Sequence, residues 1–516
     1  MSELNAGRFS RNVAATLAFF VLSLAVGVLY APFVISRMGV EVYGLIPLAN
    51  SATNYLSILT TAVSSAVGRY VTMHYARGEL TSANRIFNTF FFLGLALTSL
   101  LALLGILIIP YTTNWFQLPP GQEDAFIRLM GAVLAALLIG MLSTCFDAAI
   151  WVRQRFDLRS GIDTVSLAVR TGIVVVLFLV VGPRLDWVTL GIVASAVTVF
   201  VGNVVVWRRL TPELHISLAA FDWRRLPEIF GTGRWLLLNQ AGVLLAMQID
   251  LVLVNLFVGA EAGGLYAAIQ QWGNLLRTMC VQIAIVLAPA FAAQHATDNP
   301  IALAALSQRA IRLLGLVVAL PVGLLAGLGK PLLAAWLGVQ FAPLALLAVC
   351  ILLPMVVEGT HLPLSSVLLA TDKIRWASLM TIAIGVANLG LGIYLARDLG
   401  WGMYGVAAAT AFSTLLRYGL FFPLYTARVM AQPWHFYLRE MLRALAAAVC
   451  LTAAGLLISR VLPIPSWAWL GVAATGLTAV YAGVTWAWGI DTDDRARLLG
   501  LIRKPLSRFK LFARHL

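Results

Sequence analysis

Three arginines lie inside long apolar runs of this 516-residue chain: Arg170, Arg277 and Arg417. Arginine at the centre of a lipid bilayer costs at least about 2.5–3.5 kcal/mol, so each of them must face a partner or a water-filled cavity. A guanidinium binds phosphate oxygens through two parallel hydrogen bonds, which makes all three candidates for binding a diphosphate group. The alternative is an internal ion pair. This alternative is strong for Arg170, because Asp163 lies two helical turns earlier on the same face.

Side-chain amides gather in two neighbouring apolar runs, 235–257 and 263–288, and also mark the earlier run 44–68. Amides can bridge helices, or they can offer donors and acceptors to sugar hydroxyls in a wet cavity. Trp272 adds an apolar face that suits a sugar ring. The candidate sugar-binding or cavity residues are Asn50, Asn54, Asn239, Gln240, Gln248, Gln270, Gln271, Trp272 and Asn274.

Asp250, Glu358 and His361 are candidates for ion coupling, because acidic groups and histidines in membrane helices can take up a proton or bind sodium. Each of them could equally pair with a buried arginine. The four cysteines lie in apolar runs at unrelated spacings, which indicates buried side chains and no metal site. We expect no cofactor and no catalytic residue, since the sequence has no GxSxG, HExxH or GxxxxGK motif.

The composition indicates an all-α polytopic membrane protein. Apolar residues make up 60% of the chain and charged residues 11%, whereas soluble domains average about 25% charged residues. The apolar runs are continuous and long enough to cross about 30 Å of hydrocarbon, which excludes barrel strands. About fourteen runs are predicted to span the membrane: 12–36, 44–68, 88–110, 125–149, 160–182, 188–207, 235–257, 263–288, 311–332, 341–369, 376–396, 404–427, 441–462 and 466–489.

The net charge of +14 is distributed unevenly between the two sides of the predicted membrane. The side that carries the N-terminus holds 27 Lys and Arg residues, and the other side holds six. This is the positive-inside bias, and it predicts that both termini are cytoplasmic. The basic balance therefore indicates membrane topology, and we expect no nucleic-acid partner.

Two segments, 39–54 and 259–274, are similar over sixteen positions and share Gly, Glu, Gly, Leu and Asn at matching places. Six predicted helices separate them, so the two halves should have the same orientation and form a parallel repeat. The predicted organisation is an N-terminal six-helix bundle (1–210), a cytoplasmic linker (211–234), a C-terminal six-helix bundle (235–430), two additional transmembrane helices (431–489) and a basic cytoplasmic tail (490–516).

The segment from Arg37 to Glu79 resembles the start of the polysaccharide-repeat (O-antigen or exopolysaccharide) flippases of the multidrug/oligosaccharidyl-lipid/polysaccharide exporter superfamily. It reads Arg-Met-Gly-Val-Glu-Val-Tyr-Gly-Leu, followed by Asn50 and Asn54, Ala66-Val-Gly-Arg-Tyr-Val and a basic turn. The resemblance implies a non-enzymatic transporter in the bacterial cytoplasmic membrane. Its cargo would be an undecaprenyl-diphosphate-linked oligosaccharide, moved from the inner to the outer leaflet by alternating access.

The resemblance leaves two other functions open. One is export of another lipid-linked or amphiphilic molecule, including the peptidoglycan precursor. The peptidoglycan-precursor flippases resemble a pattern with an arginine in the first helix, whereas the first helix here, from Asn12 to Ser36, has no charge. The other is a membrane enzyme of polysaccharide synthesis, which the short loops disfavour, or a non-transporting scaffold in that synthesis. The expected partners are the lipid-linked oligosaccharide, membrane lipids, a coupling proton or sodium ion, and other polysaccharide-assembly proteins.

Overall fold

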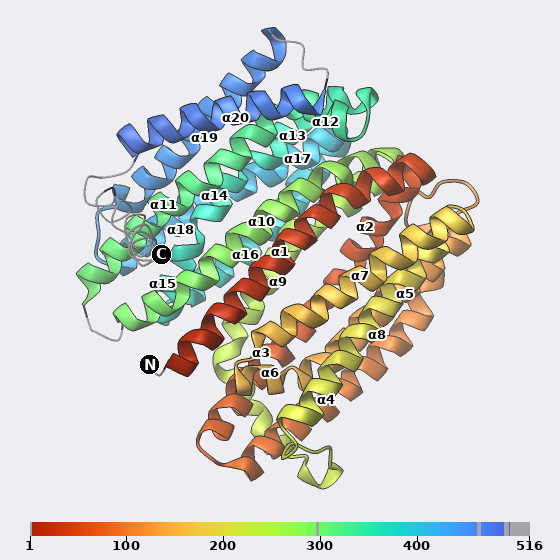
Figure 1. Ribbon diagram of the computed structural model, residues 1–516, viewed down its shortest axis with the longest axis vertical. Coiled ribbons are helices and arrows are strands. Elements are labelled where there is room, and N and C mark those ends of the chain that lie inside the picture. The colour runs from red at the N-terminus through yellow and green to blue at the C-terminus, as the bar shows by residue number, and fades with distance from the viewer. Residues whose placement is uncertain (1–2, 296–298, 462–465, 490–494, 496–516) are drawn as a thin grey trace, which may run out of the picture. The chain divides into compact units, whose positions relative to one another are not determined.

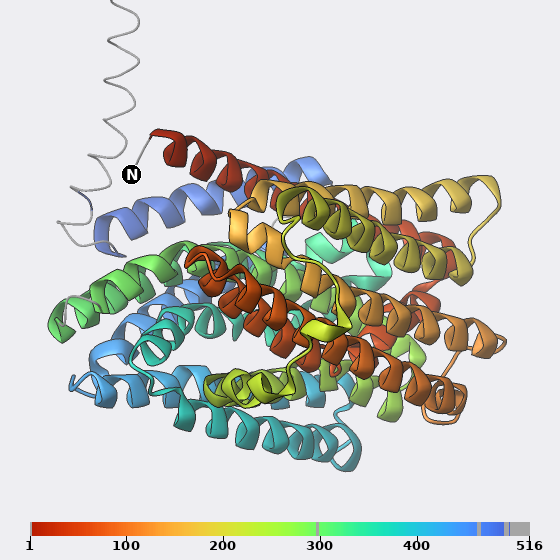
Figure 2. The ribbon, with the colours of Figure 1, turned by 90° about the horizontal axis from the view of Figure 1, so that it is seen from below.

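The computed structural model describes residues 3–295, 299–461, 466–489 and 495, and these contain helices and no strand (Figures 1 and 2). The prediction of an all-α polytopic membrane protein is confirmed. Within the described residues, twelve helical segments are long and apolar enough to span a membrane, so the count of fourteen is not confirmed. The predicted run 44–68 is divided between two helices, α2 (Val40–Asn54) and α3 (Ser57–Ala76). The run 263–288 lies in α10 (Ala260–His295), which carries the amides and Arg277.

The chain folds into two compact units, Met1–Leu275 with Ile374–Ser413, and Leu276–Lys373 with Thr414–Leu516. This division by packing does not follow the predicted bundle boundaries, because α9 (Leu226–Phe257) packs on α2 and α3 of the first half. A sequence repeat and a packing unit are different properties, so the bundle boundaries stay a prediction. The tail 490–516 lies outside the described residues, apart from Arg495.

The first unit consists of long helices that pack in neighbouring pairs. Close pairs are α5 with α8, α7 with α8, α1 with α7, and α9 with α16. Besides α2, α3, α9 and the start of α10, its helices are α1 (Glu3–Met38), α4 (Leu80–Ile108), η1 (Ile109–Asn114), α5 (Glu123–Phe146), α6 (Ala148–Arg153), α7 (Phe156–Val180), α8 (Leu185–Leu210), η2 (Leu218–Ala220), η3 (Trp223–Arg225), α16 (Ile374–Ile393), η5 (Tyr394–Asp398) and α17 (Gly402–Thr414).

The second unit is organised by the pairing of α11 with α19. Their backbones approach closely, since a Cβ on Gly455 would lie 2.8 Å from the Gly327 carbonyl carbon. Small residues permit such contacts between membrane helices. The elements are the rest of α10, α11 (Pro300–Gly327), α12 (Gly329–Trp336), η4 (Val339–Leu344), α13 (Ala345–Leu352), α14 (Met355–Thr360), α15 (Leu362–Ala370), η6 (Leu415–Phe421), α18 (Phe422–Val429), α19 (His435–Val461), α20 (Trp467–Val484) and η7 (Thr485–Gly489).

The glycines shared by the two repeated segments have identifiable structural roles. Gly39 and Gly259 precede α2 and α10 and have φ values of 83° and 125°, a region that residues with a Cβ rarely adopt. Gly44 and Gly264 bring the two copies into backbone contact. A Cβ on Gly44 would lie 2.6 Å from the Gly264 Cα, and a Cβ on Gly264 would lie 2.0 Å from the Val40 carbonyl oxygen.

A second contact within the first unit joins the loop before α5 to the end of α9. The Asn255 side chain at the end of α9 accepts a hydrogen bond from the Gln117 N–H at 3.0 Å and donates one to the Gln117 carbonyl at 3.0 Å. The Gln117 side chain donates to the Leu256 carbonyl at 2.9 Å. The loop before α5 is therefore bound to the end of α9 by the side chains of Asn255 and Gln117, each of which pairs with main-chain groups of the other segment.

We predict that Gly264→Ala lowers the thermal stability of the purified protein, because the added methyl group has no space beside the Val40 carbonyl. The expected cost is about 1–3 kcal/mol, typical of overpacking. Gly140→Ala in α5 is the matched control, since nothing lies within 4 Å of a Cβ there. Equal melting temperatures for the two variants in the same detergent would contradict the close contact.

Candidate functional site

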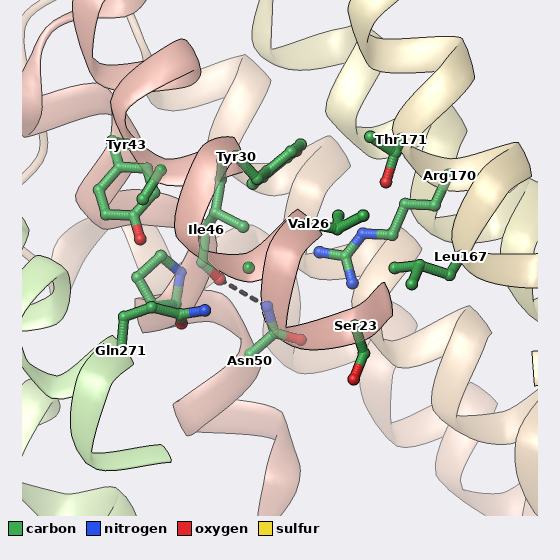
Figure 3. A pocket seen from close by; sticks show the side chains of 13 residues that line it. Ser23, Val26, Tyr30, Tyr43, Ile46, Asn50, Leu167, Arg170, Thr171 and Gln271 are labelled. Carbon is green, nitrogen blue, oxygen red and sulfur yellow. Dashed lines mark hydrogen bonds between the residues drawn. The ribbon is translucent and has the colours of Figure 1, made fainter. Parts of the chain in front are cut away.

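A cavity of about 230 Å³ lies within the first unit, between α1, α2, α7 and the first part of α10 (Figure 3). Most of its wall is apolar, and a few polar groups converge on it, as is usual for ligand sites. Its lining residues are Ser23, Val26, Gly27, Tyr30, Ala31, Tyr43, Ile46, Pro47, Asn50, Leu167, Arg170, Thr171 and Gln271.

Arg170 supplies the positive charge of this cavity. Its side chain extends from α7 toward α1 and α2, and its guanidinium lies near Val26 and Asn50 in Figure 3. The alternative pairing with Asp163 is not formed. Asp163 instead accepts a hydrogen bond from Arg159 Nε at 3.3 Å, and Arg159 also pairs with Asp147. Arg170 makes no ion pair within the part of the chain that the structure describes.

The other polar groups of the cavity are positioned to bind oxygen-rich groups. Asn50 donates its amide N–H to the Ile46 carbonyl at 2.8 Å, and its side-chain oxygen accepts no hydrogen bond from a described residue. The Tyr30 hydroxyl is buried and has no hydrogen-bond partner among the residues that the structure describes. The Gln271 side chain extends into the cavity from α10. Gly27 on α1 leaves space for it, since a Cβ on Gly27 would lie 3.2 Å from Gln271 Nε2. A ligand with phosphate or hydroxyl oxygens could satisfy these groups.

The cavity brings together three of the residues singled out from the sequence: Arg170, Asn50 and Gln271. Sequence reasoning missed Ser23, Tyr30, Tyr43 and Thr171, whose hydroxyl groups are ordinary in apolar helices and carry no spacing signal. The remaining candidate amides and Trp272 do not line this cavity; they are Asn54, Asn239, Gln240, Gln248, Gln270 and Asn274.

Arg277 lies in the second unit and forms an ion pair with Glu358. Its Nε donates to Glu358 Oε1 at 2.6 Å and its Nη2 donates to Oε2 at 3.1 Å, which is the bidentate geometry. The carboxylate is 11% exposed and the guanidinium 31%. The pair joins α10 to α14 within this unit, and it uses the guanidinium edge with which a phosphate would form the same two bonds.

Arg417 has a different environment. It lies in the π-helical turn η6 and is 3% exposed, with its guanidinium carbon 4.3 Å from the centre of the Tyr418 ring. Its Nε–H has no hydrogen-bond partner in the described part of the chain. His361 stacks on Tyr418 with ring centres 3.8 Å apart and donates from Nδ1 to the Glu358 carbonyl. Cation–π contact and the nearby Glu358 carboxylate offset part of the cost of burying Arg417.

Asp250 is the centre of an oxygen-rich cluster in the first unit. It is 3% exposed, and it accepts hydrogen bonds from the Tyr266 hydroxyl at 2.9 Å and the Thr410 hydroxyl at 2.7 Å. Asn388 donates to Thr410 Oγ1 at 3.3 Å, so α9, α10, α16 and α17 all contribute. Such a carboxylate can hold a proton or a small cation.

We predict that Glu358→Gln and Arg277→Gln each destabilise the protein by up to about 3 kcal/mol, because each removes one partner of a partly buried ion pair. The double variant should lose less than the two single variants together. The pair Arg128–Asp186, with side chains 53% and 39% exposed, is the control and should show coupling below about 1 kcal/mol. Unfolding of all variants in the same detergent gives the two double-mutant cycles, and additive losses at Arg277 and Glu358 would contradict the pairing.

Comparison with known proteins places the chain in a family. Residues 38–346 match the family described as polysaccharide biosynthesis protein. A relative from Bacillus subtilis (strain 168), the uncharacterized membrane protein EpsK, is 32% identical over 504 residues, which cover 96% of this chain and 98% of the relative.

Two solved structures share the fold. The lipid II flippase MurJ in an inward closed conformation has a TM-score of 0.63 and 12% identity, over 92% of this chain and 98% of that one. An inward-facing multidrug resistance MATE family transporter of the MOP superfamily has a TM-score of 0.61 and 15% identity, over 82% of this chain and 94% of that one. The expected resemblance to polysaccharide-synthesis membrane proteins is therefore confirmed: the chain is a multi-pass membrane protein of the polysaccharide biosynthesis protein family, and it shares the fold of these two structures.

Proposed function

We propose that the protein is a flippase that moves an undecaprenyl-diphosphate-linked oligosaccharide from the inner to the outer leaflet of the bacterial cytoplasmic membrane. The observation that carries the proposal is Arg170, a cation held between apolar helices with no ion-pair partner among the described residues, in a mostly apolar cavity into which a few hydroxyl and amide groups point. Retaining an uncompensated arginine in such a position is costly, and a bound diphosphate offsets this cost. Membership of a polysaccharide biosynthesis family and the fold of MurJ support a glycan-lipid cargo.

The size of the cavity limits which part of this cargo it holds. At about 230 Å³ it is smaller than the roughly 300–1,000 Å³ of pockets that enclose drug-sized ligands. We assign it to the diphosphate and the group next to it, with Arg170 on the phosphate oxygens and Asn50 and Gln271 on oxygens at either side. The remaining sugars and the lipid tail must extend beyond it.

Transport would proceed by alternating access of the two repeated bundles, with both termini in the cytoplasm. In this proposal the backbone contact between Gly44 and Gly264 closes the pathway at the external ends of α2 and α10, and the two helices separate there when the site opens outward. We propose that the Asn255–Gln117 hydrogen bonds break in the same step, because Gln117 also lies beside Gly259 at the start of α10.

Asp250 is the group we assign to ion coupling. Its surrounding hydroxyl and amide oxygens suit a sodium ion, and the carboxylate itself suits a proton. Glu358 is engaged by Arg277, which stabilises its charged form and makes it less suited to release and rebind an ion during each cycle. His361 donates to a backbone carbonyl and stacks on an aromatic ring, so we assign it a packing role.

Export of a different amphiphilic pyrophosphate lipid, including the peptidoglycan precursor, would use the same cavity. The two functions differ in what accumulates on the inner leaflet when the protein is lost. Surface glycan falls in the first case, whereas cell-wall synthesis stops in the second.

We predict that Arg170→Gln reduces transport about tenfold or more, because a charge-assisted bond to phosphate contributes about 1.5–3 kcal/mol. Arg170→Lys should retain part of the activity, since it keeps the charge and loses the bidentate geometry. Surface glycan and the leaflet distribution of the lipid-linked oligosaccharide are measured in a deletion strain that carries each variant. Arg184→Gln is the control, because Arg184 is exposed in the loop before α8. Wild-type transport in Arg170→Gln, at equal membrane abundance, would remove the diphosphate site from this cavity.

We predict that Asp250→Asn uncouples transport from the ion gradient, because the amide keeps the shape of the carboxylate and cannot change its charge. In membrane vesicles, transport by the wild type should fall when an ionophore collapses the proton or sodium gradient, and transport by Asp250→Asn should not respond. Asp186→Asn removes an exposed carboxylate and should respond as the wild type does. An unchanged ionophore response in Asp250→Asn would exclude this group as the coupling site.

A further inference from the structure

The segment between α8 and α9, residues 211–224, is bound to the start of α4 by side-chain amides. We call this segment the connector; in Figure 1 it is the yellow-green stretch that follows α8. Asn84 accepts a hydrogen bond from the His215 N–H at 2.9 Å. Asn88 accepts one from the Ser217 N–H at 2.7 Å and donates to the His215 carbonyl at 2.8 Å. Farther along, Thr89 Oγ1 accepts from the Asp222 N–H at 3.1 Å.

This docking satisfies backbone groups that would otherwise need water, and it fixes which side chains point inward. Thr211 and Leu214 are buried, and Leu214 joins the apolar core beneath α4. The apolar side chains that follow are exposed instead, although their backbone is held in place. The exposed fractions are 44% for Ile216, 73% for Leu218, 42% for Phe221 and 70% for Trp223.

The charges around these apolar side chains are predominantly positive. Arg208, Arg209 and Arg224 are exposed at the two ends of the connector. Its two acidic groups are engaged within the protein: Glu213 accepts a hydrogen bond from the Tyr75 hydroxyl at 3.1 Å, and Asp222 accepts one from the Arg224 N–H at 3.2 Å. An outward face of apolar and aromatic side chains bordered by arginines is the composition that binds at an anionic lipid interface.

The position of the connector along α4 agrees with a location at the lipid interface. The helical segment from Leu80 to Asn114 has 35 residues, or about 52 Å at 1.5 Å per residue, which is longer than the roughly 30 Å of hydrocarbon. Part of it must therefore project from the hydrocarbon. The first turns, which carry Asn84, Arg85 and Asn88, are its polar end, and these are the turns that hold the connector.

We propose that the connector is a membrane-surface anchor, in which Leu218, Phe221 and Trp223 insert among lipid head groups while the neighbouring arginines contact anionic phosphates. The anchor holds the polar end of α4 and the end of α8 at a fixed depth. It is separate from the transport cavity and does not depend on the identity of the cargo.

Environment-sensitive fluorescence tests this with the purified full chain in lipid nanodiscs. The four cysteines are replaced by serine or alanine, and one reporter dye is attached at Leu218→Cys or, as the aqueous control, at Arg77→Cys, an exposed polar position on the loop before α4. The nanodiscs contain a lipid with a nitroxide near the head-group end of its acyl chain. The dye at position 218 should be quenched about threefold more than the dye at position 77 and should be protected from iodide.

A second variant tests whether the arginines of the connector contact anionic lipid. Replacing Arg208, Arg209 and Arg224 by Gln should remove the difference in quenching at position 218 between phosphatidylglycerol-containing and pure phosphatidylcholine discs. Iodide-accessible, unquenched dye at position 218 in both lipids would overturn the proposal. Protection that appears only after a cell extract is added would also overturn it, because it would assign the surface to a protein partner. Neither nitroxide quenching nor iodide accessibility depends on transport, so the outcome is independent of the proposed flippase activity.

Discussion

The first unit depends on the close backbone approach of α2 and α10 at Gly44 and Gly264. Helices with side chains at these positions would stand farther apart, and the cavity would lose its shared wall. The approach lets Gln271 on α10 reach a space otherwise lined by α1, α2 and α7, and Gly27 leaves room for it. The sequence repeat is therefore visible as a physical contact. Its glycines are the residues that the contact and the two helix starts require.

The three membrane arginines show three ways in which an apolar environment accommodates a cation. Arg277 forms a bidentate ion pair with the Glu358 carboxylate, and Arg417 packs against the ring of Tyr418. Arg170 faces a cavity that is lined by no carboxylate. The pair of Arg277 and Glu358 joins α10 to α14, whereas the buried Arg417 keeps one N–H without a hydrogen-bond partner among the described residues. Arg170 differs from both, because it borders a space that water or a ligand can enter.

Composition and the length of the apolar runs were sufficient to predict an all-helical membrane protein, because these features depend on properties summed over twenty or more residues. The partners of individual charges could not be predicted in the same way. Arg170 and Asp163 lie on one helical face, yet Asp163 bonds to Arg159, which is one turn away on α7 and also reaches Asp147 on another element. Arg277 and Glu358 are 81 residues apart, so only the tertiary fold shows the pair. The hydrogen bonds from Asn84 and Asn88 to the connector could not be predicted for the same reason, because they depend on which turn of α4 lies beside the connector.

Helix α10 provides a direct physical link between the proposed coupling group and the proposed substrate cavity. Tyr266, whose hydroxyl binds Asp250, lies five residues before Gln271, which lines the cavity. Both side chains belong to the same rigid helix, between its contact with α2 at Gly264 and the end of the unit at Leu275. A change in the charge of Asp250 alters what Tyr266 binds, and a displacement of α10 at that point moves Gln271 and the Gly264 contact together. In the proposed mechanism, ion binding, substrate binding and closure of the pathway would therefore act through the same helix, as coupled transport requires.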